Sequence, residues 1–208
     1  MKLPFTRNDL VAILVIVGVL GFFIFGSLNR ARLRAHRVCC NCHLKQVGLA
    51  FRQWALDNFN TNPMGLSTNS GGTMEHLATG ETFRHFQIMS NELNSAIVLA
   101  CPSDSRRPVK EFGRGFSNTN VSYFVGIVTN EHFPQMFLSG DRNITGGTRL
   151  ANGIVELTAS HNADWGKDLH KSQGNVALAD GSVQGFSASK LREALANTGV
   201  ETNRLAMP

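Results

Sequence analysis

Hydrophobic side chains form one uninterrupted apolar run near the start of the chain. The run extends from Leu10 to Leu28 and contains no charged residue. A helix needs about 20 such residues to cross the hydrocarbon layer of a bilayer. A secretory signal peptide has a shorter apolar region and a small-residue cleavage site, whereas this run continues into helix-favouring, charged sequence. The pattern therefore predicts a retained transmembrane helix over residues 10–28.

Beyond this run, apolar residues recur at spacings of three and four, as on one face of a helix. The members of this stripe are Cys40, Leu44, Val47, Phe51 and Trp54. An apolar helix face must lie against another part of the protein. We therefore expect residues 29–59 to continue the membrane helix in amphipathic form and to pack on a single globular head made by residues 60–208.

Short apolar segments in the head predict an antiparallel sheet. The segments are rich in β-branched and aromatic residues and cover residues 96–100, 121–129, 135–139 and 154–158. Residues 175–186 alternate apolar and polar positions on both sides of Asp180-Gly181, a dipeptide that suits a type I′ hairpin turn.

Helical segments complete the head. Residues 76–93 predict a short helix, and Ser187 or Ser189 can cap a final short helix that ends near Asn197. The last residues are predicted to be frayed. The expected fold class is α+β, with a long N-terminal helix packed on a small antiparallel sheet.

The formal net charge of +5 at pH 7 reflects a basic cluster at the membrane edge. Arg30, Arg32, Arg34 and Arg37 follow the apolar run closely. Basic residues at that depth gain roughly 1 kcal/mol each near an anionic surface, so lipid headgroups are the expected partner. No basic groove interleaved with aromatic residues is visible, and nucleic acid is not an expected partner.

Enzymatic signatures are absent from the sequence, which predicts a protein that is not an enzyme. The chain has no Gly-x-Ser-x-Gly elbow, no His-Glu-x-x-His helix and no phosphate-binding Gly-x4-Gly-Lys loop. Asp141 and Arg142 lie in a Gly- and Asn-containing segment that reads as a solvated turn after a strand.

Metal and cofactor chemistry has two candidate locations. Cys39, Cys42 and His43 have the Cys-x-x-Cys-His spacing of c-type haem attachment, and with a distant ligand they could also hold zinc. Five residues are a small motif, and no second ligand pair lies nearby. Calcium could use Asp164, Asp168 and Asp180, but these are sparse and lack loop-ligand spacing. The prediction is therefore no cofactor, with haem, zinc and calcium as alternatives.

Several motifs resemble those of type IV pilins and type II secretion pseudopilins. Phe5, Thr6 and the acidic Asp9 match the mature start of that family, which reads FTLIE. The chain also resembles the large bacterial group of prepilin-like proteins with a C-terminal His-x9-Asp-Gly element. The matching segments are residues 40–51 (CNCHLKQVGLAF), residues 101–104 (CPSD), and His170 followed at that spacing by Asp180-Gly181.

The resemblance implies a pilin-like fold and processing of the N-terminus. Residues 1–9 would contain the leader, a prepilin peptidase would cut between Pro4 and Phe5, and the new amine would be methylated. Members of the family have Gly where this chain has Pro4. Asp9 would pair with the amine of an adjacent subunit, or alternatively lie in the headgroup layer with Arg7.

The resemblance further implies a pseudopilin-like structural subunit. Its partners would be other pilin or pseudopilin subunits and inner-membrane assembly proteins. It would be a single-pass protein of the bacterial inner membrane with a periplasmic or extracellular head, although the positive-inside rule alone favours the reverse orientation. The alternatives are an unprocessed membrane-anchored binding protein and a haem-carrying protein.

The motif residues also imply local structure. Cys40 and Cys101 match family positions and would form a disulfide in an oxidising compartment, worth roughly 4 kcal/mol on the entropic model. Two buried free thiols are the alternative. In a hairpin, His170 would precede the first strand and Asp180 would lie at the turn, so the two need not touch.

Overall fold

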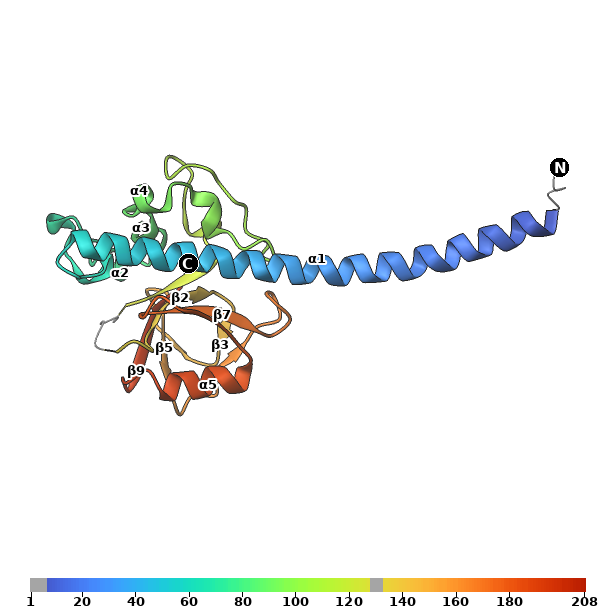
Figure 1. Ribbon diagram of the computed structural model, residues 1–208. Helices are drawn as coiled ribbons and strands as arrows, with labels where there is room; N and C mark the ends of the chain where they lie inside the picture. Colours follow the sequence, from blue (N-terminus) through green and yellow to red (C-terminus); the bar gives the residue numbers. More distant parts are fainter. Residues whose placement is uncertain (1–6, 128–132) are drawn as a thin grey trace.

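The computed structural model describes residues 7–127 and 133–208, so Pro4, Phe5 and residues 128–132 lie outside the described residues. Its first element is the 51-residue helix α1, Arg7–Asp57. No proline interrupts this segment, and a helix of this length extends about 75 Å. One half of α1 projects away from the head and the other half crosses it (Figure 1).

The projecting half of α1 is long and apolar enough to cross a membrane. An 18-residue window has a mean hydropathy of 2.8, and none of that window is buried. Phe22 and Phe25 are 78% and 72% exposed. The chain itself therefore provides no cover for this apolar surface.

The crossing half of α1 lies between two layers of the head (Figure 1). One layer contains short helices, and the other is the sheet. The helical elements are α2 (His76–Thr79), α3 (Phe83–Gln87), α4 (Ser90–Leu93) and the 3-10 turns η1 (Pro63–Gly65), η2 (Thr68–Ser70), η3 (Ala96–Leu99) and η4 (Asn118–Asn120).

Two predictions for this helical layer need correction. The single helix expected over residues 76–93 is divided into three. Gly80 adopts a left-handed conformation that ends α2, and Met89, with φ of −92° and ψ of 27°, separates α3 from α4. The strand expected over residues 96–100 is the 3-10 turn η3. Ser95 caps this turn by accepting a hydrogen bond from the Ile97 N–H, and the turn packs on α1.

The main sheet has seven strands in the order β4-β5-β9-β1-β2-β7-β8, and neighbouring strands are antiparallel. A separate pair is formed by β3 and β6. The strands are β1 (Tyr123–Gly126), β2 (Phe137–Asp141), β3 (Ile144–Thr145), β4 (Thr148–Arg149), β5 (Ile154–Thr158), β6 (Asp164–Trp165), β7 (Gly174–Leu178), β8 (Val183–Phe186) and β9 (Thr202–Ala206).

The strand over residues 154–158 is confirmed, and the predicted antiparallel arrangement is present. The strand expected over residues 121–129 is β1, with residues 128–129 outside the described part of the chain. The strand expected over residues 135–139 lies two positions further along the chain, as β2. Asp141 is therefore part of the sheet.

The expected frayed C-terminus is wrong. Residues Thr202–Ala206 form β9, which pairs with β5 along five positions and with β1 at its end. Leu205 is only 1% exposed. Polar residues occupy three of the five positions of β9, so the segment lacks an alternating apolar pattern.

The hairpin over residues 175–186 is present as β7 and β8, but its turn is not type I′. The Gly181 N–H donates to Leu178 O, and the Leu178 N–H donates to Ser182 O. Gly181 has φ of 86°, whereas Asp180 is not among the residues with positive φ. This geometry is a three-residue loop with a bulge at Gly181, which needs only one left-handed residue.

The two faces of the sheet support two hydrophobic clusters. Tyr123 and Val125 face α1, whereas Phe124 faces the opposite layer, as strand alternation requires. That opposite layer contains α5 (Ala188–Ala196), which Ser187 caps by accepting a hydrogen bond from the Lys190 N–H. The fold is therefore α+β, with the sheet between α1 and α5 (Figure 1).

Candidate functional site

A disulfide between Cys40 and Cys101 joins α1 to the head. The two Cα atoms are 5.1 Å apart, and the residues are 0% and 1% exposed. This is the pairing that the family resemblance implies. It fixes the crossing half of α1 to the segment between η3 and β1.

His170 lies directly against this disulfide. Its Nε2 atom is 3.5 Å from Cys101 Sγ and 3.5 Å from Asp141 Oδ2. The side chains of His170 and Asp141 are 2% and 0% exposed. The buried partners of His170 are therefore Asp141 and the disulfide.

The backbone at His170 is unusual. His170, Lys171 and Ser172 have φ of 49°, 55° and 60°, so three consecutive residues other than glycine are left-handed. Each such residue costs roughly 1–2 kcal/mol, and surrounding contacts must hold the conformation. The Asn143 amide contributes by donating to the carbonyl oxygens of Leu169 and Gln173, on both sides of the run.

Asp141 is the last residue of β2 and is completely buried, which overturns the expectation of a solvated turn. Its Oδ2 atom accepts hydrogen bonds from the backbone N–H and side-chain amide of Asn175, at 2.7 and 2.9 Å. Asp141 lies opposite Tyr123 in the β1–β2 register. Within the described residues, neither Asp141 Oδ1 nor the buried Tyr123 hydroxyl has a hydrogen-bond partner.

Burial controls the protonation of this site. It raises the pKa of Asp141 to about 7, against the opposing effect of the Asn175 hydrogen bonds. Burial, together with the charge of Arg37, lowers the pKa of His170 to about 4. Both pKa shifts favour the neutral form of the side chain, so His170 is neutral at pH 7 and Asp141 keeps its proton over most of the range below pH 7.

A second polar pair lies nearby. Arg142 donates two hydrogen bonds to the carboxylate of Asp104, each at 2.8 Å. Although burial alone would raise the pKa of Asp104, the hydrogen bonds and charge of Arg142 help to hold it below its ordinary value. The Cys-Pro-Ser-Asp segment, the segment around Asp141 and His170 therefore meet at one place behind α1.

Asp180 and Gly181 lie at the hairpin turn between β7 and β8, and the contacts of Asp180 are not with His170. Asp180 Oδ1 accepts a hydrogen bond from the Ser182 N–H at 2.8 Å, and Asp180 O accepts one from Arg52 at 3.1 Å. These contacts stabilise the turn and attach it to α1. The His-x9-Asp-Gly element thus contributes a buried histidine at one place and a turn at another.

The predicted haem residues lie on the crossing half of α1. His43 Nδ1 is 3.3 Å from Ala100 O, and His43 Nε2 is 3.6 Å from Cys39 Sγ. Burial lowers the pKa of His43, so its Nε2 atom is suited to accept a hydrogen bond from the Cys39 thiol. Cys42 is exposed. The haem and zinc alternatives stay predictions.

The described residues contain one group of potential metal ligands with donor atoms close together, namely Cys40, Cys101 and His170. Its two sulfur atoms are already bonded in the disulfide and offer no thiolate. Asp164 and Asp168, proposed above as calcium ligands, belong to no such group in the described parts of the chain. The calcium alternative stays a prediction.

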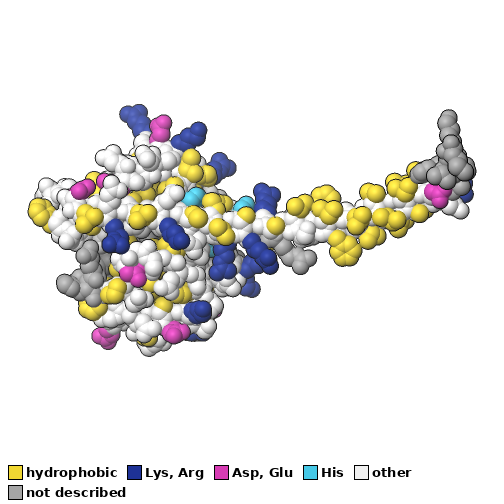
Figure 2. Space-filling view, in the orientation of Figure 1, with side chains coloured by type: hydrophobic (Ala, Val, Ile, Leu, Met, Phe, Trp, Pro, Cys, Tyr) yellow, Lys and Arg dark blue, Asp and Glu magenta, His cyan; other side chains and the backbone are white. Residues whose placement is uncertain are grey.

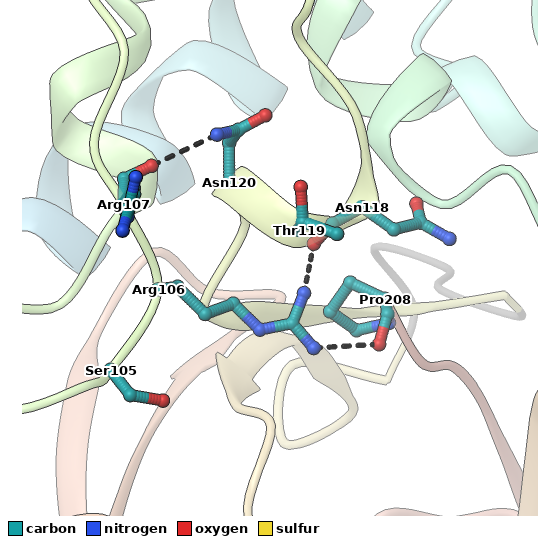
Figure 3. Close-up of a pocket in the computed structure, with 7 residues that line it drawn as sticks. All are labelled: Ser105, Arg106, Arg107, Asn118, Thr119, Asn120 and Pro208. Carbon is teal, nitrogen blue, oxygen red and sulfur yellow. Dashed lines mark hydrogen bonds between the residues drawn. The ribbon is translucent and has the colours of Figure 1, made fainter.

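The hollows on the described part of the head include two of similar volume. The first, of about 520 Å³, is lined in part by Arg106 and Pro208. The Arg106 guanidinium donates hydrogen bonds to the carbonyl oxygens of Asn118 and Pro208, as Figure 3 shows. Arg106 therefore links η4 to the C-terminal segment, and this hollow is best explained as part of the fold.

The second hollow, of about 510 Å³, lies where α1 enters the head. Arg34 and Arg37 line it from α1, and Lys167, His170 and Lys171 line it from the loop before β7. This groove places the buried His170 next to a strongly basic surface.

The sequence did not identify Asp141, Tyr123 and Asn175 as parts of a site. Their positions depend on the register of β1, β2 and β7, which brings residues distant in sequence to one end of the sheet. The sequence hinted at this site only through the three segments that resemble the prepilin-like group. The spacing of these segments does not specify which of their residues make contact. In the comparisons with known proteins, no family model, curated protein or solved structure matches the chain.

Proposed function

We propose that the protein is a pseudopilin-like structural subunit of a type II secretion or type IV pilus-type assembly. One observation carries this proposal: α1 is a single helix whose crossing half forms part of the head core, while its apolar half has no cover from the chain. Such a helix can anchor the head in a membrane and pack beside equivalent helices of other subunits.

Small residues along the apolar half suit helix association. A Cβ atom added at Gly18, Gly21 or Gly26 would meet nothing within 4 Å outside the adjacent helix. Within the described part of the chain, the space beside these three positions is therefore open to another helix. In a membrane, small residues allow a second helix to approach closely, and association then depends on van der Waals packing.

The site behind α1 gives this helix a rigid attachment. The disulfide bonds α1 to Cys101, His170 lies against that disulfide, and the Asp104–Arg142 pair ties the segment after Cys101 to the end of β2. In the proposed role, movement of the helix within an assembly is transmitted to the head. Disulfide bonding also fits a head in an oxidising compartment such as the periplasm.

The proposed partners are other pilin or pseudopilin subunits and the assembly proteins of the bacterial inner membrane. Asp9, in the first turn of α1, is the proposed partner of the N-terminal amine of an adjacent subunit. A positive charge from the neighbouring subunit would stabilise a carboxylate at that depth of a membrane. A prepilin peptidase acting between Pro4 and Phe5 would generate that amine.

Association through the apolar half can be tested with a glycine variant. We expect affinity-tagged wild-type protein, extracted from native membranes in mild detergent, to co-purify with other pilin-type subunits. Gly18→Leu/Gly21→Leu should reduce this recovery at least fivefold, because the added side chains occupy the proposed helix contact.

Val15→Leu/Val19→Leu is the matched control, since it enlarges two exposed positions of the same segment without filling a glycine site. It should retain most of the recovery. Absence of pilin-type subunits from the wild-type sample, or equal recovery with the glycine variant, would contradict the proposed function.

A further inference from the structure

We propose that the basic groove where α1 enters the head binds the headgroup of an anionic phospholipid from the membrane that anchors the protein. The groove has a volume of about 510 Å³. One wall is the segment of α1 that carries Arg34 and Arg37. The other wall is the loop that carries Lys167 and Lys171, and His170 lies between them.

The charge of the groove matches a phosphodiester. Four cationic side chains line it, with Asp168 as the one lining carboxylate. Within the described residues, Arg34, Lys167 and Lys171 take part in no salt bridge. Arg37 donates a hydrogen bond to the neutral amide of Gln173 and keeps its full charge. These groups are therefore available to an anionic ligand.

The loop wall is held in place by buried contacts. The buried side chain of His170, which is only 2% exposed, anchors this loop. The left-handed backbone continues through Lys171, which is exposed. Asn143 fixes the carbonyl groups on both sides of this run. Because burial lowers the pKa of His170 to about 4, the histidine is neutral at physiological pH. The attraction for phosphate then comes from the arginines and lysines.

The groove also lies at the depth of lipid headgroups. Arg34 and Arg37 follow Leu28, the end of the apolar run, by six and nine residues, which corresponds to about 9–14 Å along the helix. The headgroup layer is about 5–8 Å thick on each side of a bilayer. Helical side chains lean toward the N-terminus, here toward the membrane, so the long arginine side chains reach back into that layer.

Two further observations favour a lipid over a soluble anion. Leu33 lines the same groove and offers an apolar contact at its membrane side. Lys and Arg side chains gather where the helix leaves the head, beside the exposed apolar segment (Figure 2). A lipid can contact both surfaces at once, whereas free phosphate can use only the charged one.

The proposal can be tested with the full-length chain in maltoside micelles, by native mass spectrometry during titration with dioctanoyl phosphatidylglycerol. We expect saturable binding that Lys167→Gln/Lys171→Gln weakens at least tenfold. Lys110→Gln/Lys190→Gln removes the same charge at exposed positions outside the groove and should change the affinity less than twofold. Dioctanoyl phosphatidylcholine and inorganic phosphate should bind at least tenfold more weakly.

Equal weakening of lipid binding in the two lysine variants would show a general effect of charge. It would contradict the groove as the binding site. Inorganic phosphate binding as tightly as phosphatidylglycerol would overturn the lipid assignment. The assay contains no other subunit, so its result is independent of the proposed assembly role.

Discussion

At the scale of single residues, the central feature is a histidine and an aspartate buried together beside a disulfide. Their pKa shifts are opposite in sign but have the same cause, because burial disfavours the charged form of each side chain. Both Asn175 hydrogen bonds go to Oδ2, so a proton on Oδ1, which has no partner among the described residues, would leave them in place. The pair thus forms a buried polar contact between β2 and the loop before β7, next to the disulfide that holds α1.

The raised pKa of Asp141 predicts a specific dependence of stability on pH. Between about pH 4 and pH 7 the unfolded chain ionises this carboxyl while the folded protein keeps its proton. The free energy of unfolding contributed by the protonated carboxyl is therefore present at low pH and is lost as pH rises toward 7. Asp141→Asn removes this titration but keeps an oxygen acceptor.

We expect the difference in unfolding free energy, wild type minus Asp141→Asn, to fall as pH rises from 4 to 7 and then to level off. The slope should approach, but not exceed, about 1.4 kcal/mol per pH unit. Urea unfolding of the full chain in micelles, followed by the fluorescence of the buried Trp54 and Trp165, measures it. A difference that increases with pH would show a stabilised carboxylate instead.

The disulfide predicts a large and specific effect on stability. Cys40 and Cys101 are separated by 61 residues, and closing a loop of that size stabilises a fold by about 4 kcal/mol on the entropic model. In urea unfolding, Cys40→Ala/Cys101→Ala should have a lower free energy of unfolding than the wild type, by most of that amount. Cys39→Ala/Cys42→Ala, which leaves the disulfide intact, is the control, and similar losses in both variants would contradict a structural role.

Only part of this site could be predicted from the sequence. The pairing of Cys40 with Cys101 followed from two family-like positions. The pairing of His170 with Asp141 did not follow, because it depends on a left-handed loop and on the register between β2 and β7. Asp141 was expected in a turn because its flanking Gly and Asn are typical turn residues.

At the scale of elements, the last strand holds the sheet together. β9 lies between β5 and β1, so it connects the β4–β5 edge to the rest of the sheet. The apolar half of α1 and the strand Ile154–Thr158 were predictable because their own composition specifies them. β9 was not, because it obtains its stability from neighbours on both sides rather than from its own pattern.

This position of β9 predicts a strong effect from one core substitution. Leu205 is 1% exposed and packs in the cluster beneath α5. Leu205→Ala should reduce the free energy of unfolding by about 2–5 kcal/mol, because it leaves a cavity in that cluster. Arg204→Ala removes the adjacent side chain, which is 54% exposed, and should cost less than about 1 kcal/mol. Equal effects would argue against a central β9.

At the scale of the whole molecule, the protein divides into an apolar rod and a head that are joined by one continuous helix. The rod is uncovered by the chain, and the joint contains the disulfide and the buried polar pairs. This division would let one segment serve both as the proposed membrane anchor and as the proposed assembly contact.

N-terminal processing gives a prediction at this scale. Proline at the residue before the cut has a fixed φ and a ring in place of a hydrogen, which should slow a prepilin peptidase. We expect Pro4→Gly to raise the fraction of chains that begin at Phe5, measured by intact mass after extraction from native membranes. Lys2→Gly keeps Pro4 and should leave the fraction unchanged. No cleavage in either the wild type or Pro4→Gly would contradict processing as a pilin.

In the proposed assembly, the apolar half of α1 packs beside the same segment of other subunits. Photo-crosslinking in native membranes, from a benzoyl-phenylalanine placed at Phe22 or Phe25, tests it most directly because both side chains point away from the chain. We expect adducts, identified by mass spectrometry, with the apolar helix of a second copy or of another pilin-type subunit. Adducts with lipid alone at both positions would contradict it.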